Sequence, residues 1–274
     1  MVDDQLWAVI EPLVPVKAAG TPGPARMNDR SVLQGILFVL ITGIGWEDLP
    51  KSIWNARSIS AGVGGTGFRV RHDLLAQVTR LAGRRSVRGY AHHDARPLSP
   101  RGIDRFRPCH PRQLARAGQK IGSADTSPSP VDRRKIGAKH HIVTCGNGNP
   151  LAIVQSAANV NDHLVLPELL DRVRPLRGRP GRPREKITTL IADKDYDYPR
   201  AYDELERRAI TGYNPRRGTR DKVTAGRWIV EQTLALLHQY RRLSVRWEHR
   251  TDVRQGFLDL AAGLICWRRL SNRT

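Results

Sequence analysis

The sequence predicts an α/β fold preceded by a small all-helical unit, and two observations predict it. After residue 130, short extended runs alternate with amphipathic helical segments, which is typical of a sheet covered by helices. Before residue 50, two segments with helical spacing flank a loop rich in Gly and Pro. The chain has 274 residues and 39% hydrophobic content, which suits one large domain or two small ones.

Residues 1–50 are predicted to form the helical unit. The stretch DDQLWAVIEPLVP has apolar residues at helical spacing, and the stretch NDRSVLQGILFVLITG repeats this spacing up to Gly43. Each stretch begins with Asp or Asn, residues that commonly cap helices. Two short helices of this kind are typical of the start of a helix-turn-helix unit, although no third, recognition helix is evident after them.

Residues 51–120 differ in composition from both flanks. They are rich in Arg, Gly, His, Ser and Pro, and only RHDLLAQVTRLAG has a helical period. Such a composition predicts a basic and poorly ordered segment. Its later stretch, RFRPCHPRQ, has no β pattern.

Residues 121–274 are predicted to form the domain that contains the sheet. The turn Gly146-Asn147-Gly148-Asn149 is a strong hairpin signal between two extended runs. The pattern then predicts a helix in DHLVLPELLDRVRP, a strand in ITTLIA, a helix in PRAYDELERRAI, a longer helix in GRWIVEQTLALLHQYRRL and a last helix in DVRQGFLDLAAGLICWRRL.

Charge and composition narrow the class of protein. The formal net charge is +20, which indicates a polyanionic partner, most often nucleic acid. The chain has three cysteines without CxxC spacing, so a disulfide framework or a zinc site is not expected, and a reducing cytoplasm suits it. The acidic start is unlike a signal peptide, and the longest apolar run, VLQGILFVLITGIGW, is too short for a membrane span. We therefore expect no membrane association.

Two carboxylates stand out because acids are scarce. Asp193 directly follows the predicted strand ITTLIA, and polar residues at such a strand end line the binding crevice of an α/β sheet. Glu231 shares one face of a later helix with Arg227 and His238. Taken singly, Asp193 is equally a turn former and Glu231 equally half of a surface ion pair. Taken together, two carboxylates in a basic protein favour Mg²⁺ and phosphodiester chemistry.

Several motifs of the chain resemble one family. The motifs are PSPVDRRKIGAKHHIV, ANVNDH, LIADKDYDY, RWIVEQTLALLHQYRRLSVRWEHRTD and LAAGLICWRRL. Together they are similar to the insertion-sequence-five family of bacterial DDE transposases, an IS4-like group. The stretches QLWAVIEPLVP and RSVLQGILFVLITGIGWEDLP resemble the small N-terminal domain of that family. The resemblance covers about residues 3–50 and 121–270.

The resemblance implies a ribonuclease-H-like core, with a mixed sheet flanked by helices, in which two Asp and one Glu bind Mg²⁺ or Mn²⁺. It also implies cleavage and strand transfer at terminal inverted repeats by a homo-oligomer bound to double-stranded DNA, in the bacterial cytoplasm at the nucleoid. By position, Asp193 matches the second Asp and Glu231 the Glu, as catalytic and metal-binding residues. His238 stands where the family usually has Lys, and Asp195 where it usually has Gly.

Basic residues are the expected DNA contacts. Arg177-Gly178-Arg179-Pro180 is similar to the core of an AT-hook and equally suits a solvated loop. The full expected set is Arg227, His238, Arg177, Arg179, Arg182, Arg241 and Arg242.

Aromatic and histidine side chains near the motifs have two interpretations. Tyr196, Tyr240 and Trp247 are candidates for stacking on DNA ends, with core packing the more common role of such residues. His140 and His141 are adjacent in a predicted strand, so their side chains point to opposite faces. We therefore expect one in the core and one outside, and no joint metal site.

The first Asp of the triad has no clear counterpart. The stretch DRFRPCHPRQLARA, from Asp104, aligns without a gap to a stretch of the type DWSR…D-[GS]-S, which places the catalytic position on Pro111. Proline cannot bind a metal through its side chain. Two alternatives remain: residues 51–118 are read from a shifted frame, or they are a divergent segment in which Asp104 or Asp125 serves as the ligand.

Three functions follow in order of preference. The first is an active transposase, the second is a degraded copy that binds DNA without catalysis, and the third is a metal-dependent nuclease on the same core. The missing Asp is what keeps the second function open.

The frameshift hypothesis makes a prediction about the gene. Translating the segment that encodes residues 51–118 in its two other frames is expected to yield a DWSR-like strand followed by an Asp. If neither frame contains such a stretch, the divergent-segment alternative replaces it.

Overall fold

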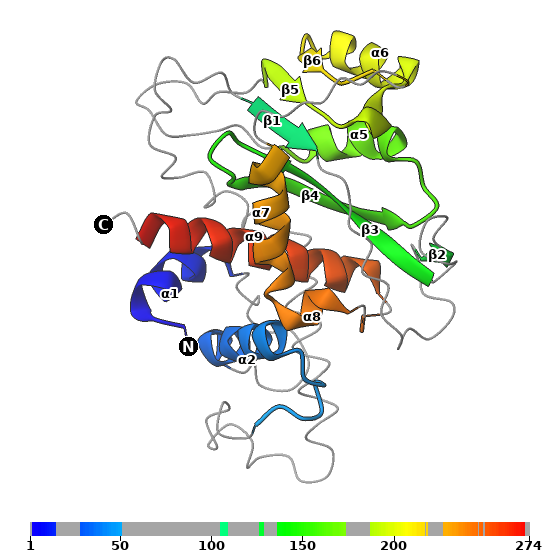
Figure 1. The fold of residues 1–274 in the computed structure, drawn as a ribbon. Helices are drawn as coiled ribbons and strands as arrows, with labels where there is room; N and C mark the ends of the chain where they lie inside the picture. Colours follow the sequence, from blue (N-terminus) through cyan, green and yellow to red (C-terminus); the bar gives the residue numbers. More distant parts are fainter. Residues whose placement is uncertain are drawn as a thin grey trace, which may run out of the picture.

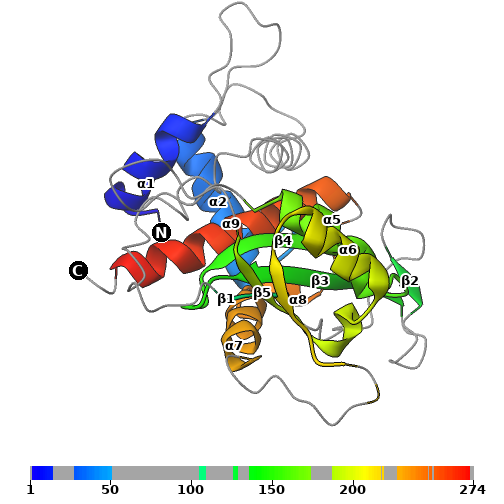
Figure 2. The same cartoon turned by 90° about the horizontal axis from the view of Figure 1, so that it is seen from above.

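The structure is a computed structural model, and it describes residues 2–14, 28–50, 105–108, 126–128, 136–173, 187–216, 218, 227–245, 247–248 and 250–271. In these residues a mixed sheet lies between two groups of helices (Figures 1 and 2). Its strands are β1 (Arg105–Pro108), β2 (Ser127–Pro128), β3 (Ile136–Thr144), β4 (Pro150–Ala157), β5 (Thr189–Ile191) and β6 (Thr211–Tyr213). The helices are α1 (Asp4–Ile10), α2 (Asp29–Thr42), α5 (Asp162–Asp171), α6 (Pro199–Arg207), α7 (Arg227–His238), α8 (Arg241–Ser244) and α9 (Thr251–Ser271), with the 3₁₀ turns η1 (Glu11–Leu13) and η4 (Lys194–Tyr196).

The strand β1 lies in the middle of the sheet. On one side it pairs antiparallel with β3, which pairs antiparallel with β4. On the other side it pairs parallel with β5, which pairs parallel with β6. The chain thus leaves β1 toward one edge and later returns to the other side of it. In an open α/β sheet, a reversal of this kind forms a binding crevice at the carboxyl ends of the two parallel strands.

The position of β1 corrects the prediction that RFRPCHPRQ has no β character, because Arg105–Pro108 is the central strand. Strand formation depends strongly on neighbouring strands, and β1 has one on each side, so the lack of hydrophobic alternation is overridden. Apart from these four residues, the predicted basic segment 51–120 lies outside the described part of the chain.

The two faces of the sheet bury different cores, as alternation along β3 requires. Val143 packs with residues of α5, α6 and the segment after β5. Its neighbour Ile142 packs with α7, α9 and the N-terminal helices. The sheet and its two helical layers are therefore held together by apolar burial on both faces.

The N-terminal helices form as predicted. Asp3 caps α1 by accepting the N–H of Leu6 at 2.6 Å, and Asn28 caps α2 by accepting the N–H of Ser31 at 3.1 Å. The helix α2 ends at Gly43, whose φ of 74° lies in the left-handed region.

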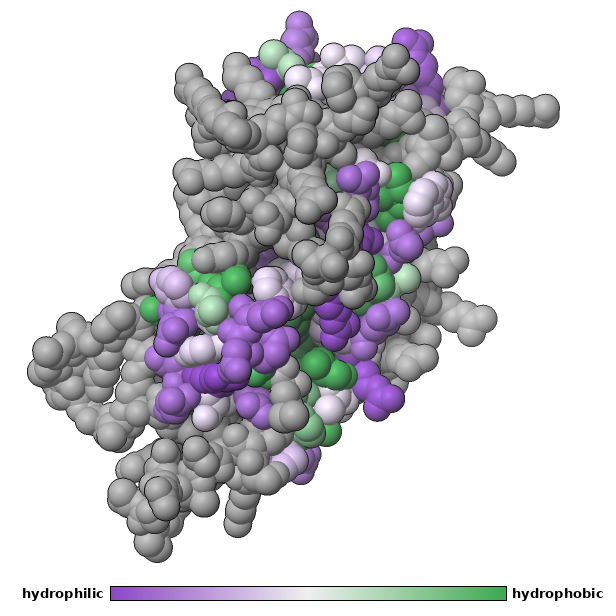
Figure 3. All heavy atoms as spheres, turned by 90° about the vertical axis from the view of Figure 1, so that its left-hand side faces the viewer, coloured by the Kyte–Doolittle hydropathy of each residue, from purple (hydrophilic) through white to green (hydrophobic). Residues whose placement is uncertain are grey.

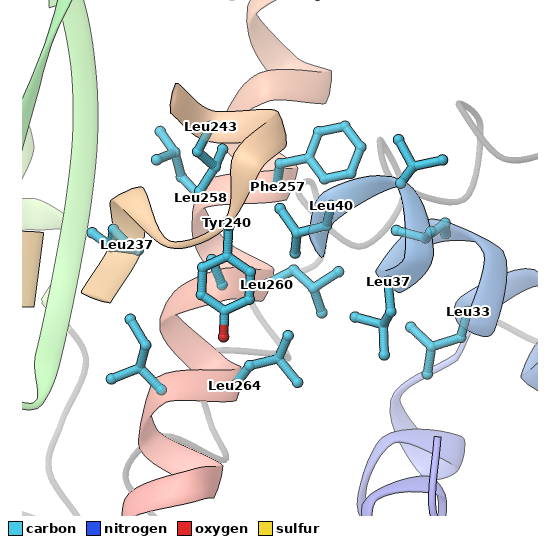
Figure 4. Close-up of a cluster of buried hydrophobic side chains, with 14 of the residues drawn as sticks. Leu33, Leu37, Leu40, Leu237, Tyr240, Leu243, Phe257, Leu258, Leu260 and Leu264 are labelled. Carbon is cyan, nitrogen blue, oxygen red and sulfur yellow. The ribbon is translucent and has the colours of Figure 1, made fainter. Parts of the chain in front are cut away.

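The core of the N-terminal helices is continuous with that of the C-terminal helices. Leu37 and Leu40 of α2 belong to one buried cluster with Tyr240, Phe257 and Leu260 (Figure 4). The apolar run that is too short for a membrane span therefore forms most of the buried helix α2. Among the described residues, no helix is long and apolar enough to cross a membrane.

The later elements follow the predicted order with two differences. The hairpin, α5, β5 and α6 lie where the pattern predicts them. The predicted long helix is instead two, because Tyr240 is extended (φ −76°, ψ 101°) between α7 and α8. The strand β6 is not predicted, since three residues are too few to show a period.

A buried arginine holds the end of α2 against α8. Arg242 is 5% exposed, and its Nε donates to Oε1 of Glu248 at 2.8 Å. Its Nη1 donates to the carbonyl oxygen of Ile44 at 2.7 Å, and its guanidinium carbon lies 5.8 Å from the ring centroids of both Trp46 and Trp247. The prediction that Arg242 contacts DNA does not fit this burial, because Glu248 already neutralises its charge in the interior.

Replacing Gly43 by Ala is expected to lower the free energy of unfolding by about 1–3 kcal/mol, because φ is positive there. An added Cβ would also lie 3.0 Å from Cβ of Arg241. Urea unfolding followed by circular dichroism measures the change. The control is Gly146→Ala, where an added Cβ meets no atom within 4 Å. Equal losses of unfolding free energy in the two variants would contradict the claim that the end of α2 requires glycine at position 43.

Replacing Arg242 by Met is expected to destabilise the protein by about 3–5 kcal/mol, because the carboxylate of Glu248 stays in the interior without its guanidinium. The matched control is Arg250→Met, whose ion pair with Asp252 is exposed and should contribute less than about 1 kcal/mol. The same unfolding measurement applies. If Arg242→Met lowers the free energy of unfolding no more than the control does, the buried Arg242 does not hold α2 against α8.

Candidate active site at the carboxyl edge of the sheet

Asp193 lies two residues beyond β5, at the carboxyl end of a strand beside the centre of the sheet. Its backbone is extended (φ −79°, ψ 170°), and its Oδ1 accepts the N–H of Lys194 at 2.6 Å. The side chain therefore caps the turn η4 and is half-buried. The preceding residue, Ala192, donates its N–H to the carbonyl of Tyr213, which fixes the strand end against β6.

The turn after Asp193 is closed by several hydrogen bonds. The N–H of Tyr196 donates to the carbonyl of Asp193, and the N–H of Asp197 donates to the carbonyl of Lys194, both at 3.0 Å. The side chain of Asp197 accepts the hydroxyl hydrogen of Tyr202 at 2.7 Å, which links the turn to α6. Asp197 thus serves the turn into the next helix. These bonds give Asp193 a defined backbone frame.

Glu231 is presented on the exposed face of α7. This helix packs against β3 and β1 through a face that includes the buried Val230, Thr233 and Leu234. The hydroxyl of Thr233 donates to the carbonyl of Gly148 at 2.7 Å, which ties the helix to the β3–β4 turn. Because that face is fixed on the sheet, Glu231 is exposed. The central strand β1 therefore lies beside both the strand before Asp193 and the helix that carries Glu231.

The register of β1 limits where a third carboxylate can come from. Arg105 pairs with Thr189 and Phe106 with Leu190, so the strand starts level with a residue four positions before Asp193. Four strand residues span about 13 Å. A ligand level with Asp193 would therefore follow Pro108 rather than precede Arg105.

The described residues do not complete a metal site. None of the residues of β1, with the sequence RFRP, is an acid, and no group of three His, Cys, Asp or Glu side chains in the described part of the chain is placed to hold a metal ion. The earlier candidates Asp104, Pro111 and Asp125 lie outside the described residues. The structure therefore places two of the three expected carboxylates, Asp193 and Glu231.

The expected DNA contacts have different surroundings. Arg241 is exposed, whereas Arg177, Arg179, Arg182 and the side chain of Arg227 lie outside the described residues. His238 is half-buried, with its ring centroid 6.4 Å from that of His140. Burial and the nearby Arg254 lower the pKa of His238. At neutral pH its ring is therefore neutral and lacks the fixed charge of the Lys that it replaces.

The adjacent histidines of β3 correct another prediction, because both are buried, one on each face of the sheet. His140 lies 3.1 Å from Nη2 of Arg254, so its Nε2 accepts that hydrogen bond. His141 lies on the other face, and burial lowers its pKa to about 4. Neither histidine faces outward.

The aromatic candidates divide between the core and the surface. Tyr196 and Tyr240 are buried, which favours core packing for both, whereas Trp247 is 53% exposed. Three further rings among the described residues, Tyr202, Tyr213 and Trp228, are exposed and were not expected from the sequence. The signal for Trp228 was its place three residues before Glu231, on the helix of the motif. On the face shown in Figure 3, hydrophobic residues lie in small groups between hydrophilic ones.

Two protein families match the chain. The family described as "Transposase DDE domain" matches residues 109–265, and the family described as "Putative transposase of IS4/5 family" matches residues 2–61. Residues 62–108 lie between the two matches.

Two proteins of Burkholderia cepacia are similar to the chain. The "Putative transposase for insertion sequence element IS402" is 39% identical over 205 residues, which are 74% of this chain and 97% of that protein. The "Insertion element IS402 uncharacterized 16.2 kDa protein" is 47% identical over 56 residues, which are 19% of this chain and 38% of that protein. No solved structure matches the chain.

The sheet reversal and the two acidic residues agree with these matches. The DDE-domain match covers more than half of the chain, and the IS402 transposase is matched over nearly its whole length. Enzymes with a transposase DDE domain cleave DNA and transfer its strands, and they generally use a divalent metal. The chain therefore belongs to the DDE transposase family of bacterial insertion sequences.

Proposed function

We propose that the chain binds the terminal inverted repeats of its insertion sequence and cleaves them with Asp193 and Glu231 as metal ligands, followed by strand transfer. The observation that carries this proposal is the position of Asp193 at the carboxyl end of β5, beside the reversal of the sheet. The exposed Glu231 on a helix packed against the neighbouring strand β1 supports it.

The finer fold assignment is a ribonuclease-H-like core. Three features support it: the first strand is central, an antiparallel hairpin lies on one side, and two parallel strands lie on the other. Helices on both faces of the sheet add to this support (Figure 2). The N-terminal unit 1–50 and the catalytic part 121–274 are the proposed functional divisions of the chain.

The described residues suit a hard divalent ion, Mg²⁺ in the cell and Mn²⁺ as a substitute. Carboxylate oxygens are its preferred ligands, and one or two of them suffice when water and substrate phosphates complete the shell. The hydrogen bond from the N–H of Lys194 orients the carboxylate of Asp193, as supporting contacts do around metal ligands. When bound, the ion would activate the attacking oxygen and stabilise the leaving one.

The charge of the chain suits DNA. The net charge of +20 and the exposed Arg241 favour phosphate contacts, and the resemblance favours a homo-oligomer on double-stranded DNA. Arg177, Arg179, Arg182, Arg227 and His238 remain proposed contacts. We place the protein in the cytoplasm at the nucleoid, where its substrate is.

A catalytically inactive copy that only binds DNA is the second candidate function. The observation that favours it is the sequence of β1, RFRP, which puts no acid in the centre of the sheet. Residues 62–108, which neither family matches, include the whole of this strand. The position expected for the first Asp falls on Pro111, just after this strand, so a change that reaches this position would remove the first Asp and leave the rest of the fold.

Charge-neutral variants test the site. Asp193→Asn and Glu231→Gln are each expected to lower Mg²⁺-dependent nicking of DNA that carries the element ends by at least about 100-fold, because each removes a ligand oxygen charge. The controls are Asp203→Asn and Glu206→Gln, exposed acids of α6 that undergo the same chemical changes. Gel analysis of labelled ends with Mg²⁺ or with a chelator measures the cleavage.

The outcomes separate the candidate functions. Strand-transfer products from the unaltered chain support a transposase, and nicking without them indicates a nuclease. End binding in a mobility-shift assay without any nicking indicates the inactive copy. Equal losses in the site variants and the α6 controls would rule out a specific role for Asp193 and Glu231.

A further inference from the structure

A line of buried hydrogen bonds runs across strands β3 and β4, beneath the turn that carries Asp193. Nε2 of His141 lies 2.8 Å from Oγ of Ser156 on the neighbouring strand β4. Its other ring nitrogen, Nδ1, lies 3.5 Å from the hydroxyl oxygen of Tyr196, at the long limit of a hydrogen bond. His141 is 0% exposed and Tyr196 is 1% exposed, so the two groups meet inside the core.

The direction of each hydrogen bond follows from the last link of this chain. Ser156 donates its hydroxyl hydrogen to the carbonyl of Ala157 at 3.3 Å, so its oxygen is the acceptor for Nε2–H of His141. The Nδ1 atom then carries no hydrogen and accepts the hydroxyl hydrogen of Tyr196. Burial keeps His141 neutral, because it lowers the pKa to about 4. A single tautomer of His141, with its hydrogen on Nε2, therefore allows every hydrogen bond from Tyr196 to Ala157.

Tyr196 connects this path to Asp193. It is the last residue of η4, the turn that Asp193 caps, and its N–H donates to the carbonyl of Asp193 at 3.0 Å. Its own carbonyl accepts a hydrogen bond from the side chain of Asn214 at 3.3 Å, just after β6. The turn is thus attached to β3 through the tyrosine ring and to the end of β6 through the tyrosine backbone.

We infer that His141 and Tyr196 are positioning residues: the neutral histidine, oriented by Ser156, holds the tyrosine hydroxyl and thereby fixes the turn that presents Asp193. Neither residue touches substrate or reacting atoms in this role. The use of the turn for metal binding rests on the proposed function, whereas the rigidity of the turn does not. Their effect on the site is to keep the carboxylate of Asp193 in one orientation.

Hydrogen exchange of the full-length chain tests this inference without needing activity. Tyr196→Phe removes one hydroxyl and keeps the ring, and it is expected to speed exchange of the amides at 196 and 197 by roughly fivefold. Exchange in β3 and β4 should stay unchanged. The matched control is Tyr240→Phe, because Tyr240 is also buried and its hydroxyl has no hydrogen-bond partner among the described residues.

Two further variants complete the test. Ser156→Ala keeps the side chains of both His141 and Tyr196. It should also speed exchange of the amides at 196 and 197, by a smaller factor, because His141 loses its orienting contact. It supplies the answer if Tyr196→Phe does not fold. Unchanged exchange at 196 and 197 in the folded variants overturns the inference.

Mn²⁺ binding, measured from the paramagnetic resonance signal of the free ion, tests the link to the site. Tyr196→Phe should weaken Mn²⁺ binding by about tenfold, as loss of supporting contacts does at metal centres, and Asp193→Asn should weaken it further. Faster exchange together with unchanged Mn²⁺ binding in Asp193→Asn would count against the proposed metal role and leave the positioning of the turn standing.

Discussion

The parallel pairing of β1 with β5 is the constraint on which the rest of the structure depends. It joins the hairpin side of the sheet to the side that carries Asp193, and it creates the reversal at which a crevice forms. The helix α7 packs against β1 and β3, so the same pairing also relates Glu231 to Asp193. Loss of this pairing would separate the two carboxylates into different halves of the fold.

Local signals account for the parts of the fold that the sequence predicts well. Helix caps, the hairpin turn and the strand before Asp193 are each encoded within a few residues. The two candidate site acids, Asp193 and Glu231, also stand out in the sequence, and the roles proposed for them come from motifs that resemble a family. The features that could not be predicted from the sequence depend on contacts between residues far apart in the chain. β1 needs strands on both sides, and Arg242 is buried because Ile44 and Glu248 receive its hydrogen bonds.

Two buried polar groups fix the placement of neighbouring elements. On one face of the sheet, Arg242 joins the N-terminal helices to α8. On the other, His141 and Tyr196 connect β3 to the turn that presents Asp193. Groups of this kind are expensive to bury unless fully paired, so each fixes one geometry where apolar packing would allow several. A DDE transposase needs such fixed geometry because its carboxylates must hold a divalent ion beside one phosphate.

The central claim is that Asp193 and Glu231 together hold a divalent ion, and anomalous diffraction from crystals soaked in Mn²⁺ tests it most directly. The account predicts a Mn²⁺ peak within about 2.5 Å of a carboxylate oxygen of each residue, and it predicts that any third protein ligand follows Pro108 in the chain. A fully occupied Mn²⁺ site elsewhere, with both carboxylates free of metal, would contradict the claim.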